Sequence, residues 1–539
     1  LDLTESLKSA GNDEDEDGGG GGGGGGRIVV RSKSSSFTNK AGAQAEPGGA
    51  SGGLNPGSAG GRGTVVFIRI DAGATTTVDN SKADDLDLEV YRSWRWEPAV
   101  EGSFDYEKVL VRADTQVVGG GGDATINAPF FKLESSSWDT TVESTNGFAT
   151  ASDVTINTGD MMVTDSTIEM GNSNQWTVNS TTSYDQSGGS ANAQKFDING
   201  SADLSFSDTT VTAQFIEIDG NSLAISASGT FSGDVRGHGP NAGPGAGGAG
   251  ITGGGGGHGG TGGNGRNASN GGLFNGSSFV PVLFGSGGGN GTRSAGGTGG
   301  GAVKINVVGL FRLDGTISCN AVPGGDNSNG ALGGGGAGGS ILGTCGSFVG
   351  SGLLRANGAR GGQDASTVGN EDGGGGGGGG GRIVISYLDS TFSSKSSARV
   401  DGGSASGGFN PGVAGQVGTI GFLDRDDNTL EVYAGWRWEE QDRPFLFNQL
   451  SSHRLSNNLG ALIRGGTTSA FNVDVTGAVS LDVGTVWSAD GQDLVLDSST
   501  LSANSTTFSF SGQNLEILSE LLASYTSCTL TTADLTLRG

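Results

Sequence analysis

The stretch DGGGGGGGGGRIVI, Asp372–Ile385, places nine consecutive glycines directly before an arginine and three β-branched residues. The same arrangement, DGGGGGGGGGRIVV, occurs at Asp17–Val30, 355 residues earlier. Glycine-rich tracts ordinarily behave as flexible linkers, because glycine has more conformational freedom than any other residue. A linker has no reason to keep one length. Two runs of equal length instead indicate an ordered slab, in which backbones without Cβ atoms pack closely and hydrogen-bond sideways.

The similarity between the two regions continues beyond the glycines. Asn55-Pro56-Gly57 recurs as Asn410-Pro411-Gly412, again 355 residues later. The segment DDLDLEVYRSWRWE, which ends at Glu97, recurs as DDNTLEVYAGWRWE, which ends at Glu439, at an offset of 342 residues. The sequence therefore predicts a tandem repeat of roughly 340 to 355 residues.

Two shorter periods lie inside this repeat. Segments with alternating apolar residues, typical of a strand with one buried face, begin 21, 21 and 20 residues apart at Asn472, Asp493, Asn514 and Asp534. In the glycine-rich part, strand-like segments begin 38, 42 and 37 residues apart at Ala302, Ser340, Arg382 and Thr419. One such strand per turn is typical of a parallel β-helix, and the longer turns leave room for a glycine-rich arm.

The predicted fold is all-β: parallel β-helix or solenoid rungs with glycine-rich, polyglycine-like slabs, arranged in a tandem repeat. We expect a partial glycine-rich solenoid module at 1–100 and a Ser/Thr-rich parallel β-helix at 101–233. A second glycine-rich module is expected at 234–438, followed by an incomplete Ser/Thr-rich β-helix at 439–539. Because the chain opens inside a repeat, we expect it to be a segment of a longer polypeptide.

The composition excludes several classes of protein. Of 539 residues, 109 are glycine and only 33% are hydrophobic, so a conventional compact core is not expected. The 10 prolines, and the lack of glycine at every third position, exclude collagen. The net charge of −26 argues against nucleic acid as a partner, because phosphates favour lysine and arginine. No apolar run approaches the roughly 18 residues of a membrane span, so no transmembrane segment is predicted in this chain.

The strongest acidic cluster is Asp424, Asp426 and Asp427. It is a candidate calcium site, although it lacks the spacing of a known calcium loop, and a solvated turn before a strand is the alternative. A β-helix polysaccharide lyase or hydrolase would need paired carboxylates. Because the cluster has a partial counterpart at Asp84 and Asp85, we predict no catalytic residues and no cofactor other than possible calcium.

Two tryptophan pairs are further candidates. Trp94 and Trp96 recur as Trp436 and Trp438, with an arginine between the indoles of each pair. Alternate residues of a strand share a face, so the indoles of each pair point the same way. They are predicted either to stack sugars or anchor a neighbouring subunit, or to pack where the two kinds of rung meet.

Six asparagines lie in glycosylation sequons: Asn179, Asn199, Asn267, Asn275, Asn290 and Asn504. In a secreted protein these are candidate N-glycan sites, and three of them would coat the glycine-rich arms.

The order GHGGTGGNGRN, LFGSGGG, GGGAVKI, GTISCNA, GGGGAGGSI and GGGGGGGGGRIVISY resembles the glycine-rich modules of large secreted surface proteins. Among these are mastigoneme proteins, the subunits of hair-like filaments on flagella, and the modules are also similar to those of some bacterial surface adhesins. The resemblance covers Asp234–Trp438 and its partial copy at Asp17–Trp96. It implies a glycosylated subunit that polymerises with itself at the cell or flagellar surface, and it supplies no catalytic residues. The alternative function is a glycan-binding adhesin or fibre protein, and a β-helix lyase or hydrolase is ranked below it.

Overall fold

The computed structural model is nearly all β. It describes residues 103–436 apart from 113–114, 120–122, 141–152, 171–173, 267–268, 328–330, 364–372 and 406–410. Before residue 103 it describes 26–32, 40, 43–45, 64–70, 85–91 and 93–96, and after residue 436 it describes strand backbone alone, between 445 and 537. These residues contain the 3-10 helix η4 (Lys395–Ser397), a further residue in 3-10 conformation, Lys40, and no α-helix. The prediction of an all-β chain is confirmed.

The chain divides into two compact units, the first of residues 1–212 with 219–221 and the second of residues 213–218 with 222–539. The strands of the first unit are β1 (Arg27–Ser32), β2 (Thr64–Ile70), β3 (Asp85–Tyr91), β4 (Ser93–Trp96), β5 (Ser103–Asp105), β6 (Lys108–Val111), β7 (Gln116–Gly119), β8 (Ala124–Asn127), β9 (Phe130–Glu134), β10 (Ser137–Asp139), β11 (Val154–Thr164), β12 (Thr167–Glu169), β13 (Gln175–Ser187), β14 (Ser190–Gly200) and β15 (Asp203–Ser207). The boundary between the units falls within β16 (Thr210–Gly220).

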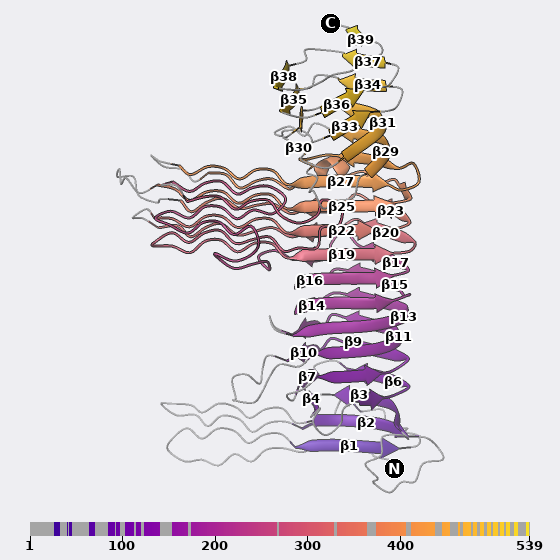
Figure 1. The fold of residues 1–539 in the computed structure, drawn as a ribbon. Helices are drawn as coiled ribbons and strands as arrows, with labels where there is room; N and C mark the ends of the chain where they lie inside the picture. The colour runs from indigo at the N-terminus through magenta and orange to yellow at the C-terminus, as the bar shows by residue number, and fades with distance from the viewer. Residues whose placement is uncertain are drawn as a thin grey trace. The chain divides into compact units, whose positions relative to one another are not determined.

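Three parallel ladders run through the first unit (Figure 1). The first joins β3, β6, β9, β11, β13 and β15, and the second joins β5, β8, β11, β13 and β14. The third joins β4, β7, β10, β12 and β14. Long strands such as β11 and β13 contribute one half to each of two ladders. The pairing of β2 with β3 is antiparallel.

Alternation of buried and exposed side chains places the core inside these ladders. In β9 and β13 every second residue of the apolar part is buried, as expected for strands with one face against a core. Trp138 and Trp176 are fully buried, and their rings meet edge to face with centroids 5.2 Å apart. Such pairs add to the stability gained from burial alone.

The second unit begins with β17 (Ser222–Ile225), β18 (Thr230–Ser232), β19 (Ala302–Val307), β20 (Leu310–Leu313), β21 (Thr316–Ser318), β22 (Ser340–Thr344), β23 (Ser347–Val349), β24 (Leu353–Arg355), β25 (Arg382–Tyr387), β26 (Asp389–Ser390), β27 (Thr419–Asp424) and β28 (Thr429–Val432). From β17 to β23 each strand pairs in parallel with the strand three places later in the chain. Thus β19, β22 and β25 form one ladder, β20, β23 and β26 another, and β18, β21 and β24 a third. The first ladder continues to β27, which pairs antiparallel with β28.

The remaining strands of the second unit are β29 (Phe445–Ser452), β30 (Leu462–Ile463), β31 (Thr467–Val475), β32 (Ala478–Leu481), β33 (Val486–Ala489), β34 (Asp493–Leu496), β35 (Thr500–Asn504), β36 (Thr507–Phe510), β37 (Asn514–Ile517), β38 (Leu522–Thr526) and β39 (Leu535–Leu537). Their pairings are parallel throughout. The strands expected from the sequence at Ala302, Ser340, Arg382 and Thr419 begin at those residues. The predicted domain boundaries at 100, 233 and 438 stay predictions.

Candidate functional site

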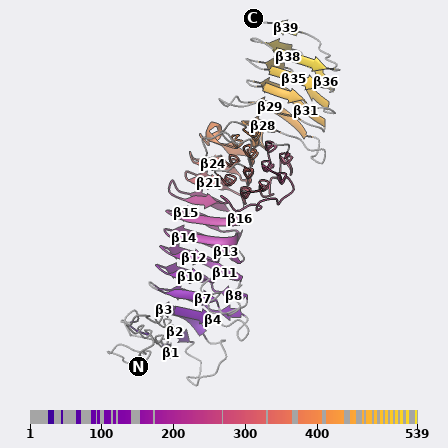
Figure 2. The same ribbon diagram turned by 90° about the vertical axis from the view of Figure 1, so that its left-hand side faces the viewer.

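Four glycine-rich arms leave the ladders of the second unit and return at the first residues of β19, β22, β25 and β27. They comprise residues 233–301, 319–339, 356–381 and 400–418. Figure 1 shows their described parts running side by side away from these strands, and Figure 2 views the same arms along their length. We call their described residues the glycine bundle.

The run Gly373–Gly381 is fully buried inside the glycine bundle. Its amides donate hydrogen bonds with a period of three residues. Gly376 and Gly379 donate to the carbonyls of Gly253 and Gly256, at 2.9 and 2.8 Å. The amides of the next two glycines in each triplet donate to two other segments, 413–416 and 356–359. Three residues per turn is the geometry of a polyproline II helix, which makes no hydrogen bonds within itself.

The carbonyls of the same run accept from different neighbours. Those of Gly376 and Gly379 accept from the amides of Gly335 and Gly338, at 2.9 and 3.0 Å, and those of Gly377 and Gly380 accept from segment 260–263. The Gly378 carbonyl accepts from the amide of Gly403, at 2.7 Å. Every amide and carbonyl of residues 376–381 therefore has a partner, although the run has no side chains and lies in no β-ladder.

Glycine is required in this run because neighbouring segments approach its backbone too closely for a side chain. A Cβ built on any residue from Gly375 to Gly381 would lie 1.8 to 2.1 Å from a carbonyl oxygen of another segment. Those carbonyls belong to 333–339, 260–263 and 400–403. The run thus has six neighbours in all, the others being 253–256, 356–359 and 413–416. None of these glycines has the positive φ that favours glycine for conformational reasons, so the missing side chain is what the packing demands.

The comparable run Gly18–Gly26 falls almost wholly outside the described residues. The ordered packing expected for it from the sequence stays a prediction.

Buried polar side chains lock the glycine bundle to the strands. His258, on the first arm, places Nε2 2.8 Å from the Ser340 Oγ and Nδ1 3.2 Å from the Asn275 Oδ1. Arg382 contacts the Asn275 carbonyl through Nε and Nη2, at 3.3 and 3.1 Å, and bonds Ser278 through Nη1. Ser340, Arg382 and Thr419 are the first residues of β22, β25 and β27 and are paired in register.

This network was not anticipated from the sequence, which gave no role to His258. A histidine beside a serine hydroxyl is the contact that activates a nucleophile in hydrolases. Here both side chains are 0% exposed, and the Ser340 hydroxyl donates to the Leu283 carbonyl at 2.6 Å. Burial, together with the nearby Arg382 charge, lowers the pKa of His258 to about 3. The pair is therefore neutral and closed to substrate, and its role is structural.

The candidate calcium residues lie at the turn between β27 and β28. The Asp424 carboxylate accepts hydrogen bonds from the backbone amides of Asp426 and Asp427, at 3.0 and 3.1 Å. This is an Asx turn, in which the side chain replaces a backbone acceptor. Within the part of the chain that the structure describes, no group of three or more His, Cys, Asp or Glu side chains is placed to hold a metal ion.

The tryptophans that the structure describes point inward. Trp94 is 8% exposed and Trp436 is 0% exposed. The Trp436 ring meets that of Phe279 edge to face at 4.9 Å and fills the space beside Gly421, where a Cβ would lie 2.0 Å from it. Buried indoles favour the packing role over sugar stacking. The side chain of Trp96, and all of Trp438, lie outside the described residues.

The sequon asparagines fall into different environments. Asn179 belongs to a column of stacked side chains on β5, β8, β11 and β13: its Nδ2 donates to Asn157 at 2.7 Å, Asn157 donates to Asn127 at 2.6 Å, and Asn127 donates to Asp105 at 2.6 Å. We call these four residues the asparagine ladder. Asn199 lies next to Asn179 in the register of β13 and β14.

The sequon asparagines of the glycine bundle also carry backbone contacts. Asn275 donates from Nδ2 to the Gly257 carbonyl at 3.0 Å, whereas Asn290 accepts at Oδ1 from the Gly296 amide at 2.8 Å. Asn267 and the side chain of Asn504, on β35, lie outside the described residues.

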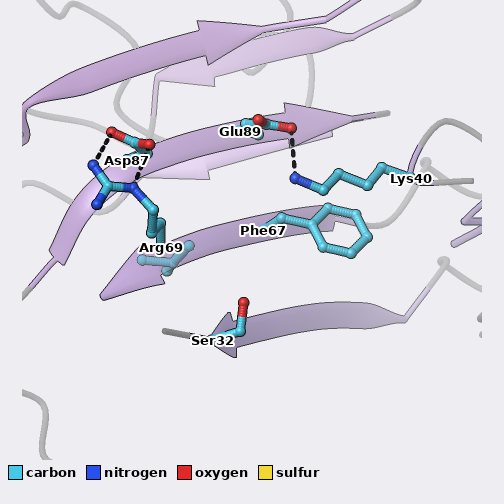
Figure 3. A pocket seen from close by; sticks show the side chains of 7 residues that line it. Ser32, Lys40, Phe67, Arg69, Asp87 and Glu89 are labelled. Atoms are coloured by element: carbon cyan, nitrogen blue, oxygen red, sulfur yellow. Dashed lines mark hydrogen bonds and ion pairs between the residues drawn. The ribbon is translucent and has the colours of Figure 1, made fainter. Parts of the chain in front are cut away.

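A second group of residues, unrecognised in the sequence, lies in a pocket of the first unit (Figure 3). The Lys40 ammonium lies 3.1 Å from the Glu89 carboxylate and 5.4 Å from the centroid of the Phe67 ring. Tyr91 donates to the same carboxylate at 3.2 Å. Arg69 pairs with Asp87 at the other side of the pocket, at 2.6 Å. We call Lys40, Phe67, Glu89 and Tyr91 the first cation frame.

The same contacts occur around β27 in the second unit. Lys395 Nζ lies 3.1 Å from the Glu431 carboxylate and 5.6 Å from the Phe422 centroid, and Tyr433 donates to Glu431 at 3.2 Å. These residues, the second cation frame, match the first at the sequence offsets of 355 and 342. The sequence carried two signals, the repeated LEVY motif and the lysines Lys40 and Lys395 at the offset of 355, but each lysine lies 49 or 36 residues before its glutamate.

No family model, curated protein or solved structure matches the chain. Among the described residues, no helix is long and apolar enough to span a membrane.

Proposed function

We propose that the chain is a structural subunit of an extracellular glycoprotein filament, built from stacked β-rungs and glycine-rich arms. The observation that carries the proposal is the burial of Gly373–Gly381 among six neighbouring segments with every amide and carbonyl of residues 376–381 paired. Such a run offers no side chain to a substrate. It is suited to a stiff body whose shape is set by the backbone.

The finer fold belongs to the same proposal. We propose that the parallel ladders are the faces of a parallel β-helix and that three successive strands make one rung. The pairing of each strand from β17 to β23 with the third strand along supports this assignment. A rung buries its apolar face only against the next rung, so growth along one axis is favoured. That is the growth mode of a filament.

Matching registers support the tandem repeat. Arg27 pairs with Thr64 in β1 and β2, and Arg382 pairs with Thr419 in β25 and β27. All four positions obey the offset of 355. The antiparallel partner strands keep the same register at an offset of 342, since Phe67 faces Glu89 as Phe422 faces Glu431. A filament built from copies of one module would repeat its contacts in this way.

Glycosylation is proposed chiefly at Asn199 and Asn290. Neither uses its Nδ2 nitrogen in a hydrogen bond among the described residues, whereas Asn179 and Asn275 do. Glycans on a surface with a net charge of −26 would keep such a polymer soluble in an extracellular setting. The alternative, a glycan-binding adhesin, calls for exposed aromatic platforms, and the burial of Trp94 and Trp436 disfavours it.

The proposal is tested by assembly. Purified chain would be concentrated, sedimented and imaged by negative-stain electron microscopy, with intact-mass spectrometry of the native material to count glycans. Regular fibres carrying hexose-containing additions are expected. A monodisperse monomer at every concentration, with no added mass, would overturn the assignment.

A further inference from the structure

Ser32 lies beside the first cation frame at the position that Tyr387 occupies beside the second. Ser32 is the last residue of β1 and pairs with Arg69 on β2, while Tyr387 is the last residue of β25 and pairs with Asp424 on β27. Both positions and both partners differ by 355 residues. The surrounding frames agree closely, since the lysine–carboxylate distance is 3.1 Å in each and the lysine–phenylalanine distances are 5.4 and 5.6 Å.

In the second cation frame, the tyrosine fills the space between the strands. Tyr387 is 2% exposed. The Lys395 ammonium donates to its hydroxyl at 2.6 Å and lies 4.8 Å from its ring centroid, while still pairing with Glu431. A lysine has three N–H donors and can serve both partners. The frame therefore recognises a phenol through its ring and its oxygen together.

In the first cation frame, the corresponding space is open. Ser32 is too short to reach Lys40, and a pocket of about 130 Å³ lies between them, lined also by Phe67, Arg69 and Asp87. Figure 3 shows the Ser32 hydroxyl pointing across this space towards the strand that carries Phe67 and Arg69. An enclosed apolar cavity of about 150 Å³ is sufficient to hold benzene, so the opening has the scale of one aromatic ring.

We propose that this pocket binds a phenol group, supplied by a tyrosine side chain of another polypeptide. The ring would lie where the Tyr387 ring lies in the second cation frame, and the Lys40 ammonium would donate to its hydroxyl. Arg69, which stands where the second frame has Asp424, also lines the pocket, but its guanidinium is already paired with Asp87 and Glu107. Because the frame is already held by Glu89 and Tyr91, binding requires little rearrangement. The inference does not depend on the filament assignment.

The first test measures the shared chemistry with a small probe. Isothermal titration calorimetry of the full chain with 4-methylphenol is expected to show saturable binding at one site. Toluene, which lacks the hydroxyl, should bind at least tenfold more weakly. Equal binding of the two compounds, or no binding of 4-methylphenol, would overturn recognition of a phenol.

Two exchanges between the frames locate the site. Ser32→Tyr supplies the ring from within the chain and should abolish binding of 4-methylphenol, whereas Ser32→Ala should preserve it. Tyr387→Ser should open a second site and raise the stoichiometry to two, provided that circular dichroism shows the variant folded. Retained binding in Ser32→Tyr would place the probe elsewhere, and that result stands whether or not Tyr387→Ser folds.

Whether a polypeptide supplies the phenol is tested by measuring the binding of peptides to the full chain. A peptide with one tyrosine should bind the full chain, and its phenylalanine counterpart should bind at least tenfold more weakly. Ser32→Tyr should remove this binding as well. If 4-methylphenol binds but the tyrosine peptide does not, the pocket serves a free phenolic compound and the polypeptide source is wrong.

Discussion

A Cβ placed on Gly378 would lie 1.9 Å from the carbonyl oxygen of Gly336. The Gly378 amide simultaneously donates to the Ala359 carbonyl at 2.8 Å. The two contacts come from different neighbours, and together they explain why the run tolerates no side chain. Close packing of bare backbones satisfies the polar groups that a loop would otherwise leave to water.

Replacement of Gly378 by alanine should therefore be costly. The clash involves backbone on both sides, so relief requires the arms to move apart. We expect a loss of about 1–3 kcal/mol, the usual range for overpacking of a packed interior. Gly239→Ala is the matched control, because nothing lies within 4 Å of the Cβ that it introduces. Thermal unfolding of both variants checks this, and equal midpoints would contradict the packing described for Gly378.

Hydrogen exchange should reveal the glycine bundle directly. Amides of Gly376–Gly381 are all bonded to other segments, so they open only when the arms separate. We expect them to exchange as slowly as the amides of β25. Mass spectrometry of peptides covering both regions checks this expectation. Exchange of the glycine amides within the dead time would show that the run behaves as a flexible linker.

The stability of the folded chain should depend on pH through the protonation of His258. Its pKa is lowered to about 3 in the folded chain, so the unfolded chain binds the proton more readily. The resulting stability is present above the unfolded pKa of roughly 6.5 and is lost as the pH falls towards 3. The unfolding midpoint should drop between pH 7 and pH 5. His258→Gln should reduce that drop, whereas an identical drop in the variant would assign it to other groups.

The asparagine ladder should contribute to stability in the first unit. Asn157 both donates and accepts within the ladder, so Asn157→Ala leaves the Asn179 Nδ2 without its acceptor and the Asn127 Oδ1 without its donor. We expect a loss of about 1–3 kcal/mol from the unsatisfied amides. Thr155→Ala, two residues earlier on the same face of β11, is the control. Similar denaturant midpoints for the two variants would contradict a contribution of the asparagine ladder to stability.

The repetitive features of the fold could be predicted from the sequence, because spacing alone reveals them. The starts of β19, β22, β25 and β27 at Ala302, Ser340, Arg382 and Thr419 followed from their near-regular intervals. The ordered use of glycine followed from the equal length of the two runs. Both inferences rest on period and length, which need no knowledge of distant contacts.

The side-chain sites could not be predicted, because they join residues far apart in the chain. His258 meets Ser340 across 82 residues, and Arg382 meets Ser278 across 104. The cation frames combine a repeated motif with a lysine that lies 49 residues before it in the first frame and 36 in the second. The orientation of Trp436 depends on Gly421, which leaves room for its ring. Such contacts can be identified only once the pairing of the strands is known.

The most direct measurement is cryo-electron microscopy of the native assembled material. We predict a polymer with helical symmetry in which density for Gly373–Gly381 is continuous and surrounded by six similar segments, with additional density beyond Asn199 or Asn290. Isolated monomers in which the glycine run has no continuous density would contradict both the ordered bundle and the filament.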